Sequence, residues 1–138
     1  MKFGYAHMNT AAGERKTPTA QFNRPSVNEK ISALRQSAFA RQIPTADAET
    51  LNFLLTFLAA YHPENILELG TAIGISGAAM LDICKTAHLT TVERDPAFFA
   101  EAYKNFSELG FNERVTQIAG DAGEVIETFQ TPFDFIFL

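Results

Sequence analysis

The chain has 138 residues, of which 46% are hydrophobic and 20% charged, and its formal net charge is −5. This length allows one domain with a buried core. The sequence contains no apolar run of membrane-spanning length and no apolar signal segment at its start. We therefore expect a cytoplasmic domain without membrane association. The single cysteine, Cys84, excludes an internal disulfide and is expected to lie in a helix as a core thiol.

Charge is distributed unevenly along the sequence. Most of the Lys and Arg residues lie within residues 1–41, whereas the acidic residues are concentrated in the rest of the chain. Residues 1–25 mix Gly, Pro, Thr and Asn with charged residues and show neither helical nor strand periodicity. We expect them to form a flexible basic arm, which either contacts an anionic partner such as RNA or is simply solvated.

Two helices are predicted next. Ser26 followed by Glu29 has the spacing of a capping box, and the helix that it starts has an apolar face formed by Val27, Ile31, Leu34 and Ala38. The first helix should end at residues 43–45, and Thr45 is predicted to cap a second helix. Apolar side chains surround that helix on nearly all sides, which predicts deep burial; they are Leu51, Phe53, Leu54, Leu55, Phe57 and Leu58.

The stretch from Ile66 to Gly77 is the centre of the sequence. A short apolar run ends in Gly70-Thr-Ala-Ile-Gly74 and continues into a helical pattern. This is typical of the first strand, glycine loop and helix start of a nucleotide-binding α/β unit, in which unpaired backbone N–H groups face a ligand. Glu68 before the first glycine disfavours a pyrophosphate and suits a ligand that carries an ammonium group. A tight turn with nothing bound is the alternative.

Alternating strands and helices follow. Strands are predicted at residues 89–93, 115–119 and 133–138, a long helix from Asp95-Pro96 to Gly110, and a short helix at residues 123–129. The long helix should bury Phe99, Ala102, Phe106 and Leu109. The pattern predicts an α/β fold with a parallel sheet and helices on both faces. Because the sequence stops inside an apolar strand, we expect a fold truncated after its fourth strand.

Glu93 stands at the end of the second predicted strand. Nucleotide-binding folds place an acid there to accept hydrogen bonds from both ribose hydroxyls. A glutamate that caps or pairs with Arg94 is the alternative.

Four motifs together, Glu68-Leu-Gly-Thr-Ala-Ile-Gly, Thr91-Val-Glu-Arg-Asp, Gly120-Asp-Ala and Phe133-Asp-Phe-Ile-Phe-Leu, resemble those of class I S-adenosylmethionine-dependent methyltransferases. Within this class the chain resembles the bacterial O-methyltransferases that include relatives of catechol and caffeoyl-CoA O-methyltransferase and the tRNA 5-hydroxyuridine methyltransferases. The resemblance implies a Rossmann-like fold. Residues 26–138 would then be the N-terminal, cofactor-binding part of one methyltransferase domain.

The resemblance also implies roles for individual residues. Glu68, Gly70 and Thr71 would lie near the methionine part of the cofactor, and Ser76 would bind its carboxylate. Glu93 would hold the ribose, and Asp121 with the backbone of Ala122 would meet the adenine, although Asp121 could instead only cap a helix. Weaker candidates are Ile73 and Phe99 around the adenine and residues 44–46 on the N-terminal side.

The reaction implied is methyl transfer to a hydroxyl of a small phenolic or catechol-like substrate, or of a tRNA hydroxyuridine, assisted by Mg²⁺. The metal ligands of the family would lie beyond Leu138, and the three histidines are too far apart in sequence to be predicted as ligands. The chain alone is therefore expected to be inactive. A homodimer is possible. The alternatives are an NAD(P)-binding Rossmann oxidoreductase and a non-catalytic RNA-binding module.

Overall fold

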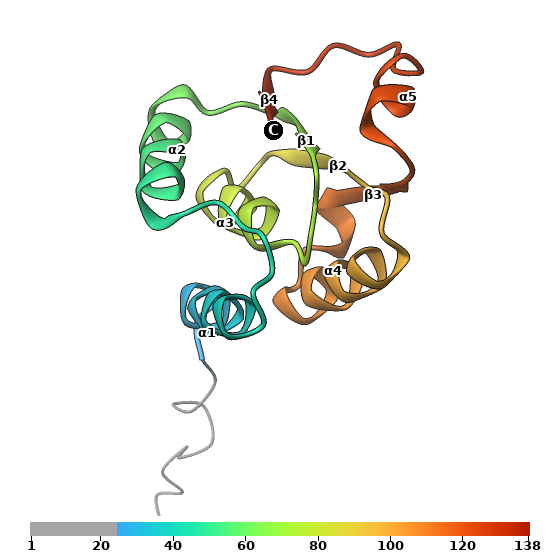
Figure 1. The fold of residues 1–138 in the computed structure, drawn as a ribbon. Coiled ribbons are helices and arrows are strands. Elements are labelled where there is room, and N and C mark those ends of the chain that lie inside the picture. Colours follow the sequence, from blue (N-terminus) through green and yellow to red (C-terminus); the bar gives the residue numbers. More distant parts are fainter. Residues whose placement is uncertain (1–24) are drawn as a thin grey trace, which may run out of the picture.

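Four parallel strands form the central sheet of the protein, for which a computed structural model describes residues 25–138 (Figure 1). The strands are β1 (Asn65–Leu69), β2 (His88–Glu93), β3 (Val115–Ala119) and β4 (Phe135–Phe137), and their order in the sheet is β3-β2-β1-β4. Leu69 at the end of β1 pairs with Val92 near the end of β2. The carboxyl ends of the two inner strands therefore meet at one edge of the sheet.

Helices cover both faces of this sheet, as predicted (Figure 1). They are α1 (Val27–Ala40), α2 (Ala48–Tyr61), α3 (Ile75–Ile83), α4 (Pro96–Leu109) and the short α5 (Ala122–Ile126). Helices α3 and α4 pack on one face of the sheet, with α1 and α2 against α3, and α5 lies on the other face. No helix in residues 25–138 is long and apolar enough to cross a membrane.

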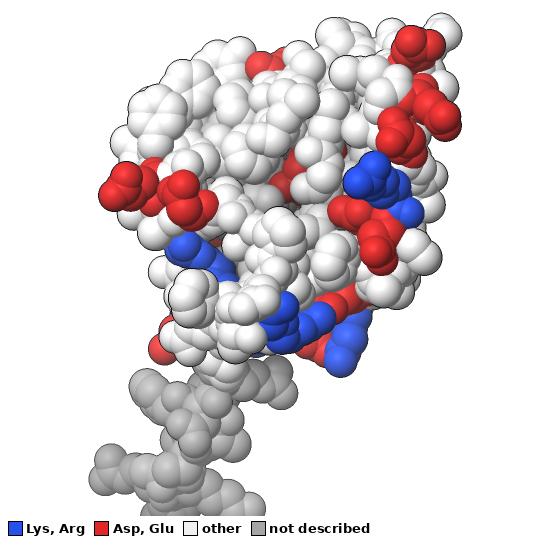
Figure 2. All heavy atoms as spheres, viewed as in Figure 1, with Lys and Arg blue, Asp and Glu red and all other residues white. Residues whose placement is uncertain are grey.

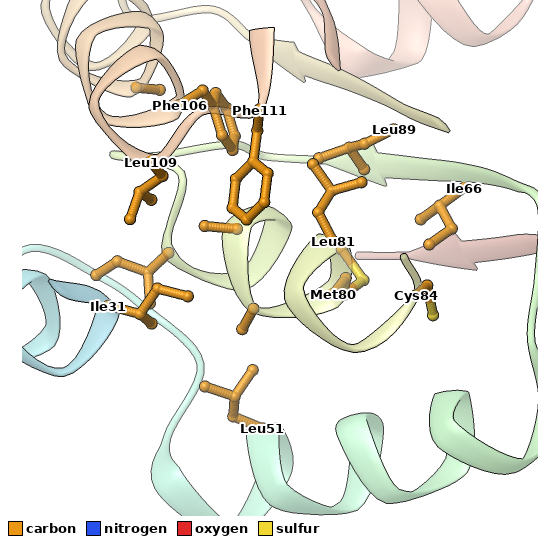
Figure 3. Close-up of a cluster of buried hydrophobic side chains, with 14 of the residues drawn as sticks. Ile31, Leu51, Ile66, Met80, Leu81, Cys84, Leu89, Phe106, Leu109 and Phe111 are labelled. Carbon is orange, nitrogen blue, oxygen red and sulfur yellow. The ribbon is translucent and has the colours of Figure 1, made fainter. Parts of the chain in front are cut away.

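The main core lies between the sheet and α3 (Figure 3). Helix α3 is apolar and buried on nearly every side because α1, α2, α4 and β2 all contact it. Side chains from five elements meet around it, among them Ile31, Leu51, Ile66, Leu89 and Phe106. This packing fixes the position of the loop between β1 and α3, which precedes the helix directly.

Several helix ends are confirmed in detail. The side chains of Ser26 and Glu29 form the reciprocal capping box at the start of α1. Asp95 caps α4, with Pro96 in its first turn, and Gly110 ends α4 with a φ of +81°. These signals are local to the sequence, which explains why they could be predicted without knowledge of the packing.

The predictions for α2 were wrong in two respects. Its N-cap is Asp47, whose side chain accepts the N–H of Thr50, and not Thr45. Only one face of the helix is buried, because α2 packs chiefly against α3, and Phe53 on the outer face is 76% exposed. Apolar composition alone did not indicate which side chains would find a neighbour.

Smaller differences concern element boundaries. Helix α5 starts at Ala122 because Asp121 caps it, and it ends at Ile126 instead of Phe129. Strand β4 is limited to the three residues that pair with β1. Cys84 is buried but follows the last residue of α3. Residues 1–24 lie outside the described part of the chain, so the basic arm and its RNA contact remain predictions.

Candidate functional site

The loop that joins β1 to α3 has an unusual backbone. Gly70, Ala72 and Gly74 have φ angles of +99°, +47° and +84°. Glycine adopts this left-handed region without steric cost, whereas alanine does not. A Cβ on Gly74 would also come within 2.9 Å of the Phe106 ring. Gly70 and Gly74 therefore allow a tight loop that lies directly on the core, whereas Ala72 adopts its left-handed conformation at a steric cost.

Most N–H groups of this loop are not available to a ligand. Those of Gly70 and Thr71 both donate to the carbonyl of Val92, and that of Gly74 donates to the carbonyl of Thr71. The N–H of Ala72 donates to Glu93 Oε2 at 2.7 Å. The expectation that unpaired N–H groups of the loop face the ligand is therefore wrong for these four residues, because the loop uses them to hold its own shape.

Glu68 lies beneath the loop, with an exposed fraction of 0%. Ser76 Oγ donates to its Oε1, and Thr91 Oγ1 donates to its Oε2 at 2.7 Å. Thr71 Oγ1 is hydrogen-bonded to Thr91 Oγ1. Since Thr91 gives its only proton to Glu68, Thr71 is the donor in that pair. Glu68 thus connects two hydroxyls of the loop region, Thr71 and Ser76, and does not itself reach the surface.

Burial has a strong effect on Glu68. Removal from water raises the pKa of its carboxyl from the ordinary 4.5 to about 7, and the hydrogen bonds from Ser76, Thr91 and the N–H of Gly77 only partly oppose this. The nearby carboxylate of Glu93 raises the pKa further. Near neutral pH, Glu68 is therefore divided between its charged and neutral forms.

Glu93 lies at the end of β2 on the same face of the sheet as Glu68. Strand residues two apart share a face, and Glu68 pairs with Thr91, two residues before Glu93. The Glu93 carboxylate accepts the N–H of Ala72 on Oε2 and that of Asp95 on Oε1. It is 8% exposed. Each oxygen retains one acceptor position beyond the bond that it already makes.

A cavity of about 330 Å³ opens beside the loop. This volume lies at the lower end of the range for small-molecule sites. Its wall combines the loop, the start of α3, the segment before α2 and the last residues of the chain, namely residues 44–46, Thr50, Leu51, residues 70–72, Ile75, Ser76, Phe137 and Leu138. The structure thus places Gly70, Thr71, Ser76 and residues 44–46 around one cavity, whereas Glu68 and Glu93 are not part of its wall.

Asp121 and Ala122 stand apart from the cavity wall. They follow β3 next to the end of β2, where the N–H of Gly120 donates to the carbonyl of Glu93. Asp121 Oδ1 caps α5 by accepting the N–H of Gly123, so the capping role is realised. The side chain is 52% exposed, and its Oδ2 lies 4.0 Å from Arg94 Nη1.

The two weaker adenine candidates are also separated. Ile73 is fully buried in the core. Phe99 was predicted to be buried but is only partly buried, and it lines a different hollow together with Tyr103 and Gln117. In the same helix, the polar Asn105 is buried instead.

Sequence reasoning missed two residues that organise the loop. Thr91 connects Thr71 to Glu68, and Asn105 Nδ2 donates to the carbonyl of Ile73 at 2.8 Å. The alternation of β2 could have indicated Thr91, because it shares the inward face with Glu93. No local signal could have indicated Asn105, which reaches the loop from α4.

A metal site is not formed by the described residues. Within residues 25–138, no three or more His, Cys, Asp or Glu side chains are grouped so that they could hold a metal ion. These residues therefore do not fit the Mg²⁺ ion that the resemblance implies, and we derive no step through a metal.

The fold and the site define a class of protein. A parallel α/β sheet carries a glycine-containing loop after its central strand, an acid after the next strand and a cavity at the carboxyl ends, as in nucleotide-binding domains. A sequence family described as "Methyltransferase domain" matches residues 67–138, which include the loop, Glu93 and strands β2 to β4. The chain belongs to this methyltransferase family. The nicotinamide-dependent oxidoreductases are thereby set aside.

Similarity to individual proteins agrees with this assignment. The chain is 35% identical over 91 residues to catechol O-methyltransferase of Niastella koreensis, covering 62% of this chain and 41% of the relative. It is 31% identical over 113 residues to protein-L-isoaspartate O-methyltransferase of Fervidobacterium nodosum, covering 76% and 56%. The chain therefore spans about half the length of these relatives.

Solved structures show the same relationship. A Staphylococcus aureus protein assigned as a caffeoyl-CoA O-methyltransferase superposes with a TM-score of 0.72 at 33% identity, covering 77% of this chain and 51% of that one. The SAH-bound methyltransferase PaMTH1 of Podospora anserina has the same fold, with a TM-score of 0.72 at 23% identity, covering 82% and 49%.

Proposed function

We propose that this chain binds S-adenosylmethionine in the cavity beside the loop and is the cofactor-binding part of an O-methyltransferase. One observation carries the proposal. The loop after β1, the start of α3 and residues 44–46 enclose a single cavity at the carboxyl end of the sheet, and Glu93 is held at the adjacent strand end. Ligands bind at this edge in open α/β folds.

We assign the parts of the cofactor to different residues. Ser76, which lies in the first turn of α3 and on the cavity wall, would bind the methionine carboxylate with support from the helix dipole. Glu93 would accept hydrogen bonds from the ribose hydroxyls at its remaining acceptor positions. Asp121 and Ala122, next to the end of β2, would meet the adenine.

Gly70 and Thr71 would contact the methionine part directly. Glu68 would act on this part differently from the direct ammonium contact that the resemblance implies. Because its carboxyl group is covered, Glu68 would support the loop region from below through its hydrogen bond with Ser76.

The reaction proposed is transfer of the methyl group from the sulfonium to an acceptor oxygen. Such a transfer depends mainly on holding the two reactants in line. We propose a phenolic or catechol-like hydroxyl as the acceptor, supported by the catechol and caffeoyl-CoA O-methyltransferases that the chain resembles. A tRNA hydroxyuridine is the alternative acceptor. Assistance by a divalent metal would require ligands other than the described residues.

A binding competition tests the cofactor assignment. We expect labelled S-adenosylmethionine bound to the chain to be displaced by S-adenosylhomocysteine and not by NAD⁺. Glu93→Ala should weaken binding because it removes the acceptor for the ribose. Glu127→Ala, which removes an exposed acid after α5, should bind as the natural chain does and serves as the control. Displacement by NAD⁺, or equal binding by both variants, would contradict the proposal.

A further inference from the structure

The hydroxyl of Ser76 has two possible hydrogen-bond acceptors, Glu68 and a ligand carboxylate. It has one proton, which it donates to Glu68 Oε1 in the structure. To bind a ligand carboxylate, it must donate the same proton to the ligand. Ser76 cannot satisfy an ionised Glu68 and a ligand carboxylate at the same time.

We propose that cofactor binding is coupled to uptake of one proton by Glu68, which releases the Ser76 hydroxyl to the carboxylate of the ligand. This inference rests on the proposed function, because it takes the ligand at the start of α3 to carry an amino-acid carboxylate. Glu68 is then a positioning residue, which acts on the ligand through Ser76.

The exchange of protons is balanced. A proton from solvent binds Glu68 Oε1, and the neutral carboxyl donates it in a hydrogen bond to Ser76 Oγ. The Ser76 proton turns toward the ligand carboxylate. Thr91 continues to donate to Oε2, so the link from Glu68 to Thr71 is retained. No covalent bond of the ligand forms or breaks.

The surroundings of Glu68 make this protonation accessible. The side chain is fully buried, and its pKa of about 7 places the neutral form within reach of physiological pH. The charged group that faces it is Glu93 from β2, which favours the neutral form. Among the described residues, the neighbours of Glu68 on α3 and β4 do not titrate; they are Ser76, Gly77 and Phe137. The same holds for Phe106 of α4, whose ring lies near Gly77.

Arrival of a ligand carboxylate at Ser76 would add a second negative charge above the buried acid. Two like charges in a region of low dielectric cannot both remain ionised without cost. The neutral form of Glu68 removes this repulsion and frees the hydroxyl donor in one step.

Calorimetry of the 138-residue chain tests the coupling. The chain is titrated with S-adenosylhomocysteine between pH 6 and 8.5 in buffers of different ionisation enthalpy, which reports the protons taken up. We expect uptake to approach one proton at the upper end of this range, and Kd to rise by up to about tenfold per pH unit above pH 7. 5′-Methylthioadenosine, which lacks the amino-acid part, should bind without proton uptake.

The variants Glu68→Gln and Ser76→Ala sharpen the test. The amide that Glu68→Gln introduces can donate to Ser76 at every pH, so this variant should bind S-adenosylhomocysteine without proton uptake and more tightly than the natural chain at pH 8. Ser76→Ala should bind more weakly and also without uptake. A purely space-filling role of Glu68 would produce neither change in proton uptake.

The possible outcomes are distinct. Equal proton uptake for the two ligands, no uptake for either, or uptake that persists in Glu68→Gln would overturn the inference while leaving the proposed function intact. The comparison of the two ligands on the natural chain decides the matter even where a variant does not fold. No binding of S-adenosylhomocysteine at any pH would overturn both the inference and the proposed function.

Discussion

At the scale of single residues, Glu68 and Glu93 show how far sequence reasoning reaches. Glu68 was predicted to precede the loop and Glu93 to stand at the end of the next strand, and the observed strand register puts both on one face of the sheet. Their different environments were not predictable. Glu68 is covered because α3 passes close to it at Gly77, where a Cβ would come within 2.9 Å of Glu68 Oε2. Close packing of this kind depends on contacts between distant segments.

The raised pKa of Glu68 predicts an unusual dependence of stability on pH. Between pH 4.5 and about 7 the folded chain holds a proton on Glu68 that the unfolded chain releases, so this group lowers the free energy of unfolding as pH rises. The total loss should be about 3 kcal/mol, and it should be complete above pH 7. Glu68→Gln lacks the titration and should gain stability relative to the natural chain across this range. Urea unfolding of both at pH 5, 6, 7 and 8 measures the difference, and a constant difference would refute it.

At the scale of elements, the ends of the helices could be predicted more accurately than their buried faces. The caps of α1 and α4 depend on residues within one turn and were predicted. Two polar residues just before α2, Thr45 and Asp47, lie close enough together that either could have been its N-cap. Only the path of the chain after α1 decides in favour of Asp47.

Removal of the α2 cap should therefore be specific to one residue. Asp47→Ala removes the acceptor for the N–H of Thr50 and should lower the thermal midpoint by a few degrees. Thr45→Ala, the matched control two residues earlier, should leave the midpoint unchanged, because its side chain does not cap the helix. Scanning calorimetry measures both variants. The reverse order would mean that Thr45 is the cap in solution.

Helix α4 supports the loop from outside the β1–α3 segment. Asn105 is buried and donates to the carbonyl of Ile73, so Asn105→Ala should leave that carbonyl without its partner and cost about 1–3 kcal/mol. It should also weaken cofactor binding. Asn112→Ala is the control, because it also removes a hydrogen bond donated by an asparagine amide, in this case an exposed one to Ser107 Oγ. Urea unfolding and calorimetric titration report the two effects; equal losses from both variants would argue against a special role for Asn105.

At the scale of the whole molecule, the sequence predicted the parallel α/β architecture and the family. Strand and helix patterns alternate clearly, and the motifs stand at the ends of the first three strands, where parallel strands bring them together. The cavity was not predictable in detail. Its wall joins residues 44–46 to residues 137–138, and only the complete packing brings such distant segments together.

The possible homodimer also belongs to this scale. Figure 2 shows a largely uncharged surface around β4 and the neighbouring part of α2. Phe53, Phe57 and Tyr61 of α2 and Ile136 of β4 are exposed in the described chain. Exposed apolar surface favours association. Sedimentation velocity should therefore detect a species of twice the 15.2 kDa chain mass. A single species of 15.2 kDa at all concentrations would exclude the dimer.

The central claim is that the loop after β1 and the acid after β2 hold S-adenosylmethionine together. Its most direct test is a titration of the ¹⁵N-labelled chain with S-adenosylhomocysteine, followed by amide NMR. We predict saturable shifts at Gly70, Thr71, Ser76 and Glu93, and no such shifts with NAD⁺. Unchanged signals at these residues, or shifts confined to another surface, would contradict the account.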